Sequence, residues 1–353
     1  MVNFDISSPV LVTGATGYVA GHIVKRLLEE GVTVHSAVRN PSDKEKLKHL
    51  ITIAENSPGE IVFFQSDLLK EGSYSEAMKG CSLVFHTASP FIWNVNDPQK
   101  DLIDPALIGT RNVLNEVNRT ESVQRVILTS SLVAIYGDNV DISNAPNGIL
   151  TEEVWNTSSS LHRNPYSFSK TVAEKDAWEI AGSQSRWDMV VLNPGVVLGP
   201  GITPFTTSES FRIVKGFGDG TFKYGIAHLE MGAVDVRDLA EAHLAATRKD
   251  TQPGRYIVNG HNTSMFELAE LLRDRFGKEY PLPKKVLPKW LAWLLTPLLV
   301  RSLTREYISR NMNHPFRADN SKSINNLGLT YRPLSQTINE MFQQMADAGI
   351  FKN

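Results

Sequence analysis

The chain has 353 residues, of which 36 are basic and 38 acidic, so its net charge is −2. Hydrophobic residues make up 41% and charged residues 21%, as in an ordinary folded globular protein. This balance excludes a disordered chain, a fibre and a disulfide-rich scaffold, and it argues against a general nucleic-acid binder. The length predicts about two domains.

The N-terminal half alternates short apolar runs with helical patterns, which predicts βαβ units and a parallel sheet. The expected strands lie at 10–13, 32–38, 61–65, 83–86, 125–129 and 189–193, and the clearest helices at 22–30, 100–118 and 166–182. Residues 195–229 are rich in glycine, proline and threonine. A βα pattern returns at 232–247 with a strand at 255–259, and 263–345 is mostly helical.

These elements predict an α/β fold, a doubly wound parallel sheet with a smaller, mostly helical second domain. We expect residues 1–195 plus 230–262 to form the first domain and 196–229 plus 263–353 the second. The boundary is not a single cut, because the pattern at 230–262 is typical of a return to the first domain.

The first predicted strand runs into the sequence VTGATGYVAG, which places Gly14 and Gly17 between a strand and a helix. Glycine permits a tight turn and lets the backbone approach a pyrophosphate closely. The following helix N-terminus offers free N–H groups and a positive dipole end to that anion. No Gly-Lys-Ser/Thr closes the loop, so it is not a Walker A motif. The loop therefore predicts a Rossmann-type dinucleotide site.

Arg39 stands at the end of the second predicted strand. A chain that binds NAD usually has Asp or Glu there, about 20 residues after the loop, to accept the ribose 2′-hydroxyl. A guanidinium instead can stack on adenine and fork onto a 2′-phosphate. We therefore expect NADPH/NADP⁺, with NADH less favoured.

Tyr166 and Lys170 lie in the sequence YSFSK, where i, i+4 spacing puts both on one helix face. Asn164 and Pro165 predict an N-cap and a first-turn proline. A phenol with a pKa near 10 is a poor acid or base at neutral pH. We expect the ammonium and the positive helix end to lower that pKa. Tyr166 could then exchange a proton with a carbonyl oxygen while hydride reaches or leaves the carbon.

A second Tyr-x-x-x-Lys pattern runs from Tyr280 to Lys284. Pro281 and Pro283 forbid a regular helix interior there, so its lysine need not share a face with its tyrosine. No catalytic role is expected for this second pair.

Ser131 closes the run VILTSS at the C-terminal end of the predicted strand 125–129, where ligands of doubly wound sheets bind. A hydroxyl there could hydrogen-bond a substrate oxygen and hold it for proton transfer. A serine at a strand end is otherwise most often a helix cap or turn former. Its coincidence with the glycine loop and the Tyr166–Lys170 pair favours the catalytic interpretation.

The longest apolar stretch, 286–300, is interrupted by Pro288, Lys289 and Pro297 and is too short to span a bilayer. An amphipathic or buried helix beneath a lid of the second domain is favoured over a membrane-surface element. The single Cys81 rules out an internal disulfide and a cysteine-rich metal site, and no metal is expected. Without a signal-peptide pattern in the first dozen residues, we expect a cytoplasmic protein, either a monomer or a homodimer.

With these residues in place, the sequence resembles the extended short-chain dehydrogenases/reductases. More narrowly, it resembles their dihydroflavonol reductase, cinnamoyl-CoA reductase and aldehyde/ketone (carbonyl) reductase branch, from about residue 8 to residue 345. The resemblance rests on VTGATGYVAGHIVKRLLEEGVTVHSAVRNP, KGCSLVFHTASP, DPALIGTRNVL, VILTSS, YSFSK and LNPGVVLGPG in that order. It implies a catalytic triad of Ser131, Tyr166 and Lys170, with Lys170 also holding the nicotinamide ribose.

The resemblance also implies contacts along the whole cofactor. They are Thr16, Gly17, Tyr18 and Val19 at the pyrophosphate, Arg39 and Lys46 at the 2′-phosphate, Asp67 and Leu68 beside adenine, Thr87, Ala88 and Ser89 along the middle, and Pro194 and Val197 at the nicotinamide amide. Asn112 matches an asparagine of the fourth helix, where a structural role is expected.

Two positions depart from the pattern of the family. Ala20 stands where a third glycine is common, and Tyr136 stands where flavonoid reductases carry a substrate-binding asparagine. The second departure argues against a flavonoid substrate. Candidate pocket residues are apolar or aromatic and predict a carbonyl compound of that kind: Phe91, Ile92, Trp93, Val133, Tyr136, Phe205, Phe211 and Tyr224.

The leading interpretation is an NADPH-dependent reductase that converts an aldehyde or ketone to the alcohol. A nucleotide-sugar epimerase or dehydratase is one alternative, and Arg39 and the Leu132-Val133 pair after Ser131 argue against it. A hydroxysteroid dehydrogenase of the same fold is a second. A non-catalytic NADP(H)-binding protein is a third, and the intact tyrosine–lysine pair argues against it. The expected partner is a small carbonyl compound, with neither nucleic acid nor a membrane span.

Overall fold

The structure is a computed structural model that describes residues 7–89, 95–204, 208–299 and 304–351. Its largest feature is a seven-stranded sheet in the order β3-β2-β1-β4-β5-β6-β9, in which all neighbouring strands are parallel. The strands are β1 (Val10–Thr13), β2 (Thr33–Val38), β3 (Glu60–Gln65), β4 (Leu83–His86), β5 (Arg125–Thr129), β6 (Asp188–Pro194) and β9 (Gly254–Val258). The predicted doubly wound parallel sheet is confirmed.

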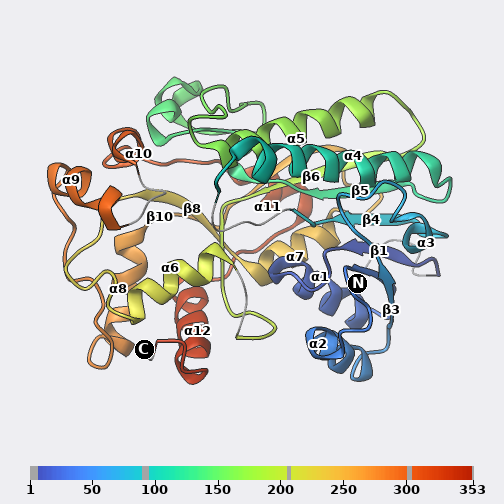
Figure 1. Cartoon of the computed structure of the whole chain (residues 1–353), viewed down its shortest axis with the longest axis horizontal. Helices are drawn as coiled ribbons and strands as arrows, with labels where there is room; N and C mark the ends of the chain where they lie inside the picture. Colours follow the sequence, from blue (N-terminus) through green and yellow to red (C-terminus); the bar gives the residue numbers. More distant parts are fainter. Residues whose placement is uncertain (1–6, 90–94, 205–207, 300–303, 352–353) are drawn as a thin grey trace.

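Both faces of this sheet are buried, as the continuous apolar runs of its strands require. Val10 and Val12 of β1 point into one aliphatic core, and Leu11 between them points into the other. Figure 1 shows α1, α2 and α7 on one side of the sheet and α4 and α5 on the opposite side. The helices of this part are α1 (Tyr18–Glu29), α2 (Lys44–Glu55), α3 (Ser75–Met78), α4 (Asp104–Arg119), α5 (Pro165–Gly182) and α7 (Val236–Ala245).

The helix expected at 100–118 begins differently. A π-helical turn covers Gln99–Ile103, and the regular helix α4 starts only at Asp104 with Pro105 in its first turn. Proline has no N–H to donate one turn back, so a regular helix that began at 100 would be broken at Pro105. Because the π-helical turn comes first, Pro105 falls in the first turn of α4, where a helix tolerates proline.

The strand order reverses between β1 and β4. The chain builds β2 and β3 on one side of β1, and then returns to build β4, β5 and β6 on the other side. In such sheets a crevice opens outside the carboxyl ends of the two strands at the reversal, and ligands bind there. The residues after Thr13 and after His86 therefore define the place of the site.

A second sheet of three strands, in the order β10-β8-β7, supports the rest of the chain. The sequence predicted a loop-rich region at 195–229, a βα pattern at 232–247 and helices after 263, and it did not predict this sheet. Its strands are β7 (Val196–Leu198), β8 (Glu230–Asp235) and β10 (His261–Ser264), and the helices around them are α6 (Glu209–Gly218), α8 (Met265–Phe276), α9 (Lys289–Leu299), α10 (Arg305–Asn311), α11 (Ser321–Leu327) and α12 (Leu334–Asp347).

The segment 230–262 is divided between the two sheets. Strand β9 lies at the edge of the large sheet and α7 packs against α1, whereas β8 pairs with β7 and β10. The predicted return of the chain to the first part is thus made by α7 and β9. Where one domain ends and the other begins stays a prediction.

The apolar stretch 286–300 contains α9, at the left edge of Figure 1 beside α10. Trp290, Trp293 and Leu294 of this helix are exposed. Of the two forms expected for this stretch, the buried helix is wrong. Within the described ranges, no helix has both the length and the hydropathy to cross a membrane.

Candidate active site

The glycine loop leaves β1 at the reversal of the strand order. Gly14 has a φ of +66°, and the N–H of Gly17 donates to its carbonyl over 2.8 Å, which closes a tight turn. Gly17 is the N-cap of α1, and no side chain caps this helix end. A Cβ on Gly14 would lie 3.1 Å from the Cα of Ala88, so only glycine lets the loop lie this close to the end of β4. An uncapped helix N-terminus beside such a loop fits a pyrophosphate.

Thr13 fixes the floor of this crevice. Its Oγ1 accepts hydrogen bonds from the N–H of Thr87 (3.1 Å) and of Ala88 (3.0 Å). The hydroxyl proton then points to Nδ1 of His86, 3.0 Å away. Burial lowers the pKa of His86 to about 3, and the ammonium of Lys170 adds to this effect, so the imidazole is neutral and accepts that proton. Two of the predicted cofactor residues therefore stand on a rigid support.

Among the other residues predicted for the pyrophosphate, Thr16 is exposed and Val19 is half-buried. The side chain of Tyr18 serves a different contact. Its hydroxyl donates to the carbonyl of Gly199 over 2.6 Å, and its ring meets Phe211 edge-on at 5.3 Å between centroids. Only the backbone of Tyr18 is left to face an anion at this helix end.

At the end of β2, Arg39 is exposed and forms no hydrogen bond or ion pair with any residue that the structure describes. The ammonium of Lys46 lies 3.3 Å from a carboxylate oxygen of Asp43, the N-cap of α2. Such an exposed pair contributes little stability, so it would cost little to separate. Both cations are available to an anion, and their contact with a 2′-phosphate stays a prediction.

The residues predicted beside adenine form an ordered turn after β3. Asp67 accepts the N–H of Leu69 on its side chain over 2.9 Å and the hydroxyl of Ser73 on its carbonyl over 2.6 Å. The buried Asn112 of α4 donates from its amide to the carbonyl of Leu68 over 2.9 Å. This bond gives Asn112 a structural contact of the kind expected.

Helix α5 carries Tyr166 in its first turn, with Asn164 at the predicted N-cap position and Pro165 directly after it, but the expected side-chain cap is absent. Asn164 adopts a left-handed conformation with a φ of +51°, and its side chain does not cap the helix. Its amide donates instead to the carbonyl of Gly137 (3.1 Å) and to Asp138 (2.8 Å). Asparagine tolerates this conformation better than most residues, so the amide can lock the preceding loop.

Tyr166 is 47% exposed. Desolvation raises its pKa to about 12, and the carboxylate of Glu209 on α6 adds to the rise. The lowering expected from the ammonium and the helix end is therefore wrong for this arrangement. At neutral pH the phenol is protonated, and that is the form in which it can give a proton to a substrate.

Lys170 lies one turn further along α5. Its ammonium is 5.9 Å from the centroid of the Tyr166 ring and donates to Oγ of Ser89 over 2.8 Å. Desolvation lowers its pKa to about 8, and the carboxylate of Glu174 opposes that shift. The bond to Ser89 ties α5 to the end of β4 and brings a predicted catalytic residue together with a predicted cofactor residue.

Ser131 is the N-cap of a short 3₁₀ turn over Leu132–Ala134, and its Oγ accepts the N–H of Val133 at 3.3 Å. Its hydroxyl proton has no acceptor among the described residues. A hydroxyl can accept one bond and donate another at once, so the capping and catalytic interpretations are compatible.

A buried carboxylate that the sequence did not single out joins α5, β6, β9 and the residue after β5 beneath the site. Glu174 on α5 accepts hydrogen bonds from Oγ of Ser130, from Nδ2 of Asn193 (2.8 Å) and from Nε of Arg255 (2.6 Å). Both charged side chains are buried, and the guanidinium of Arg255 lies 3.8 Å from the ring centroid of Trp155. Hydrogen bonds and stacking compensate part of the cost of burying this ion pair.

One feature of the sequence could have identified Glu174. It follows Lys170 by four residues, so both lie on the same face of α5, and an acid on the buried face of a helix needs a partner. The partner Arg255, far away in the sequence, could not have been named. Asn193 also donates to the carbonyl of Ser131 over 3.1 Å, so the network reaches a predicted catalytic residue.

The predicted pocket residues lie on separate elements. Phe91, Ile92, Trp93 and Phe205 are outside the described residues. Val133 is half-buried in the 3₁₀ turn, and Tyr136 packs against Phe316 at 5.4 Å between centroids. Tyr224 is 76% exposed on a turn after α6. The substrate pocket therefore stays a prediction.

The two residues predicted at the nicotinamide amide follow each other closely along the chain. Pro194 is buried and ends β6, and Val197 is half-buried in β7. They stand where the chain passes from the large sheet to the small one, and their contact with the cofactor stays a prediction.

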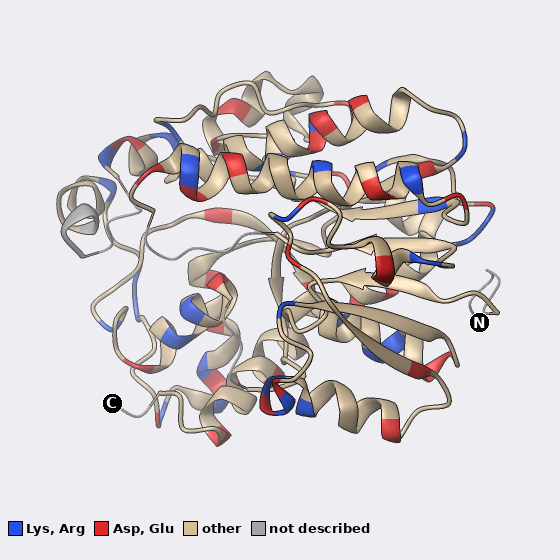
Figure 2. Cartoon of the chain, turned by 45° about the vertical axis from the view of Figure 1, so that its right-hand side comes forward, with Lys and Arg blue, Asp and Glu red and all other residues tan. Residues whose placement is uncertain are grey.

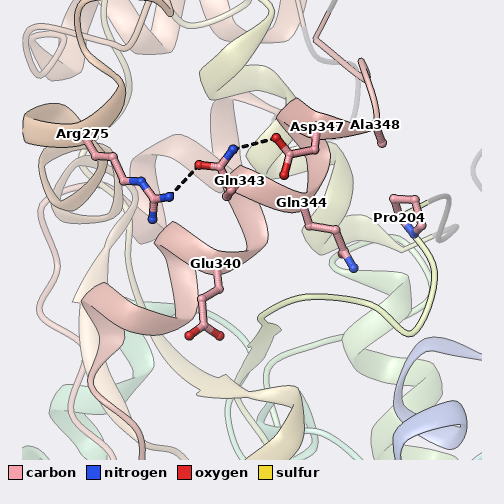
Figure 3. A pocket seen from close by; sticks show the side chains of 7 residues that line it. All are labelled: Pro204, Arg275, Glu340, Gln343, Gln344, Asp347 and Ala348. Carbon is pink, nitrogen blue, oxygen red and sulfur yellow. Dashed lines mark hydrogen bonds between the residues drawn. The ribbon is translucent and has the colours of Figure 1, made fainter.

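Two hollows differ in their chemistry. A small cavity lies beside Lys170 and is lined by polar groups that include His86, Ser89, Thr110, Ser130 and Glu174. A wider, open depression lies among the helices around the small sheet. It is lined by Pro204, Arg275, Glu340, Gln343, Gln344, Asp347 and Ala348. Figure 3 shows Gln343 bonded to both Arg275 and Asp347 across it. It contains none of the predicted site residues, whereas Ala88, Ser89 and Lys170 line the first hollow.

Comparisons with known proteins extend over nearly the whole chain. A cinnamoyl-CoA reductase of Medicago truncatula is 32% identical over 98% of this chain and 98% of the relative. An anthocyanidin reductase of Arabidopsis thaliana is 33% identical over 77% of this chain and 82% of its own. The solved structure of yeast methylglyoxal/isovaleraldehyde reductase Gre2, complexed with NADPH, is 27% identical, has a TM-score of 0.77 and covers 97% of this chain and 99% of that one.

The resemblance expected from the motifs is confirmed by these relatives. The model of the NAD dependent epimerase/dehydratase family matches residues 10–259, which span the glycine loop, Tyr166 and Lys170. The chain belongs to this family, among the extended short-chain dehydrogenases/reductases.

Proposed function

We propose that the chain reduces an aldehyde or ketone on an apolar or aromatic compound to the alcohol, with NADPH as the source of hydride. The observation that carries the proposal is the meeting of Tyr166, Lys170 and Ser89 at the reversal of the strand order. The similar proteins support it, since they are named as reductases, and the yeast protein is in complex with NADPH.

The residues present fit such a cofactor. The uncapped N-terminus of α1 and the glycine at position 14 suit its pyrophosphate, and the free guanidinium of Arg39 suits a 2′-phosphate. Lys170, when bonded to the nicotinamide ribose, would exchange its present acceptor Ser89 for a ribose hydroxyl. NADPH supplies hydride to the carbonyl carbon when bound.

The chain's own residues then supply and guide the proton. Tyr166 is protonated at neutral pH and gives its hydroxyl proton to the carbonyl oxygen as that oxygen gains charge. Ser131 donates its free hydroxyl proton to the same oxygen and holds it in place. The ammonium of Lys170 stabilises the phenolate left on Tyr166. Because the ring is partly exposed, water can return the proton.

The test is NADPH consumption by the purified chain against aliphatic, aromatic and diketone substrates, repeated with NADH. Replacement of Tyr166 by Phe should lower turnover by about 10²- to 10⁴-fold while the affinity for NADPH changes little. Tyr280→Phe is the matched control. It belongs to the other Tyr-x-x-x-Lys pattern, and its ring packs in the core of the second part.

A Tyr166→Phe variant that keeps its turnover would refute the proposed proton donor. A native chain that binds NADPH but oxidises it with no member of the panel would favour the non-catalytic alternative.

A further inference from the structure

Helix α9 presents an apolar face to the outside. Trp290, Trp293, Leu294 and Leu295 are 68%, 41%, 45% and 38% exposed, whereas Ala292 between them is fully buried. The spacing of Trp290, Trp293 and Leu294 puts these three on one side of the helix. An isolated exposed leucine is ordinary, but adjacent tryptophans and leucines on one helix mark a contact surface.

The charged residues of the segment that carries this helix have a single sign, with Glu279 and Glu306 flanking it. From Tyr280 to Arg305 the sequence contains no aspartate or glutamate, and its charged residues are Lys284, Lys285, Lys289, Arg301 and Arg305. Elsewhere acidic and basic residues are interspersed over the helices (Figure 2), and the whole chain carries a net charge of −2. Lys284, Lys285 and Arg305 are exposed, and the Arg305 guanidinium lies 4.6 Å from the ring centroid of Trp293.

A second segment extends the same chemistry. An isolated bridge pairs Ile226 with Val286 in the parallel sense, so Tyr224 and Lys284 each stand two residues before it. Tyr224 is 76% exposed, and the ammonium of Lys223 lies 4.9 Å from its ring centroid. One more aromatic ring and one more cation therefore lie next to the chain that leads into α9.

The helix is fastened to the protein on its other side. Ala292 packs with Ile308 and Met312, and the ammonium of Lys289 donates to the carbonyls of Ser309 (2.9 Å) and Met312 (2.8 Å) at the end of α10. The apolar face is thus presented on an anchored element.

We propose that this α9 surface (Tyr224, Trp290, Trp293, Leu294 and Leu295 with Lys223, Lys284, Lys285 and Arg305) binds the anionic surface of a lipid bilayer. Tryptophan and tyrosine rings lie at the level of lipid headgroups, with leucines below them and cations beside the anionic groups. A second copy of the chain fits less well, because a two-fold contact through this surface brings two positively charged surfaces together.

The experiment is co-sedimentation of the full chain with vesicles of phosphatidylcholine, alone or with about a third of phosphatidylserine. Binding should be at least about tenfold tighter to the anionic vesicles and should weaken with added salt. Combined replacement of Lys284 and Lys285 by Gln should lower binding about 25-fold, since each cation near the surface contributes about fivefold. Combined replacement of Trp290 and Trp293 by Ser should lower it by more than about tenfold.

Matched controls come from other exposed sites. Ile324→Ser on α11 removes an exposed apolar side chain, and Lys249→Gln removes an exposed cation. Both should bind vesicles as the native chain does, and the unfolding temperature of every variant should stay close to the native one. The proposal fails if anionic vesicles bind no better than neutral ones. It also fails if light scattering shows a dimer that the two tryptophan replacements dissociate.

Discussion

The hydrophobic cores around the large sheet and the small sheet are built from different residues. Around the large sheet the cores are mainly aliphatic, with Val10, Val12, Ile23 and Leu27 supplied by a strand and the helix that directly follows it. Around the small sheet the core also contains a cluster of aromatic rings from separate segments. Phe342 lies 4.6 Å from Phe276 and 4.5 Å from Phe351 between centroids.

The two parts also differ in what else they bury. Beneath the large sheet's crevice lie a buried ion pair, Glu174 with Arg255, and the neutral His86 and His243. The small sheet buries the carboxylate of Asp235 at the end of β8, but the side chain of its partner Arg237 stays 25% exposed. Buried polar groups destabilise a protein unless they are paired. The paired groups beneath the crevice therefore fix the geometry of the site, but few substitutions are tolerated there.

The largest effect is expected at the ion pair. Glu174→Ala leaves the Arg255 guanidinium buried without its carboxylate, and this should lower the free energy of unfolding by about 3–5 kcal/mol. Urea unfolding measures the change. Glu179→Ala on the exposed face of α5 is the control and should cost less than about 0.5 kcal/mol. A loss below about 1 kcal/mol for Glu174→Ala would show that the network is not under the constraint inferred here.

A substitution in the aromatic core around the small sheet provides the matching test of stability. Phe342→Ala removes a ring that contacts Phe276, Tyr280 and Phe351, and should lower the free energy of unfolding by about 3–5 kcal/mol. Leu271→Ala, an exposed position of α8, should have a much smaller effect. Thermal unfolding should show the loss with NADPH affinity retained below the transition. A large fall in that affinity would contradict the separation of the two parts.

Low pH should destabilise mainly the part of the chain around the large sheet. Burial lowers the pKa of His243 to about 4, so the folded chain binds fewer protons than the unfolded chain between about pH 6.5 and pH 4. Stability is therefore lost as the pH falls through this window and levels off below it. His243 accounts for about 3 kcal/mol of this loss in the free energy of unfolding.

Urea unfolding at pH values above and below that window should show a smaller loss for His243→Gln than for the native chain. The exposed His162→Gln is the control and should follow the native chain. Equal losses in all three proteins would contradict a neutral His243 in the folded state.

The smallest effect on stability is expected from replacing the exposed Arg39. Arg39→Asp removes a free guanidinium and places an acid at the end of β2, which should lower the preference for NADPH over NADH in kcat/KM by about 10- to 100-fold. Unfolding should be almost unchanged. Lys249→Asp makes the same change of charge at a distant exposed position and should leave the preference as it is. If both variants keep the native preference, Arg39 does not contact the 2′-phosphate.

The comparison also explains what could be predicted from the sequence. Strands 10–13, 83–86 and 125–129 were predicted to the residue, because each is a short apolar run in a repeating βα pattern. The small sheet was missed, since β7 has three residues and β10 is His-Asn-Thr-Ser, which has no apolar alternation. Such strands are fixed by partners far along the chain rather than by their own residues.

The candidate site divides in the same way. Motifs located the glycine loop, Arg39 and the Tyr166–Lys170 pair because each lies at a fixed offset from a strand or helix end. The bond from Lys170 to Ser89 and the pairing of Glu174 with Arg255 depend on tertiary contacts, which no local pattern contains. The direction of the Tyr166 pKa shift was wrong for the same reason, because desolvation around the hydroxyl and Glu209 on α6 decide it.

The close contact of Gly14 with Ala88 sets a limit for anyone who wishes to redesign this chain. Gly14 is left-handed and already the smallest residue, so a larger side chain at position 88 cannot be balanced by shrinking its neighbour. Random libraries should therefore leave these two positions unchanged. Diversity is better placed at half-buried or exposed positions such as Val133 and Tyr224, which can vary without closing the crevice.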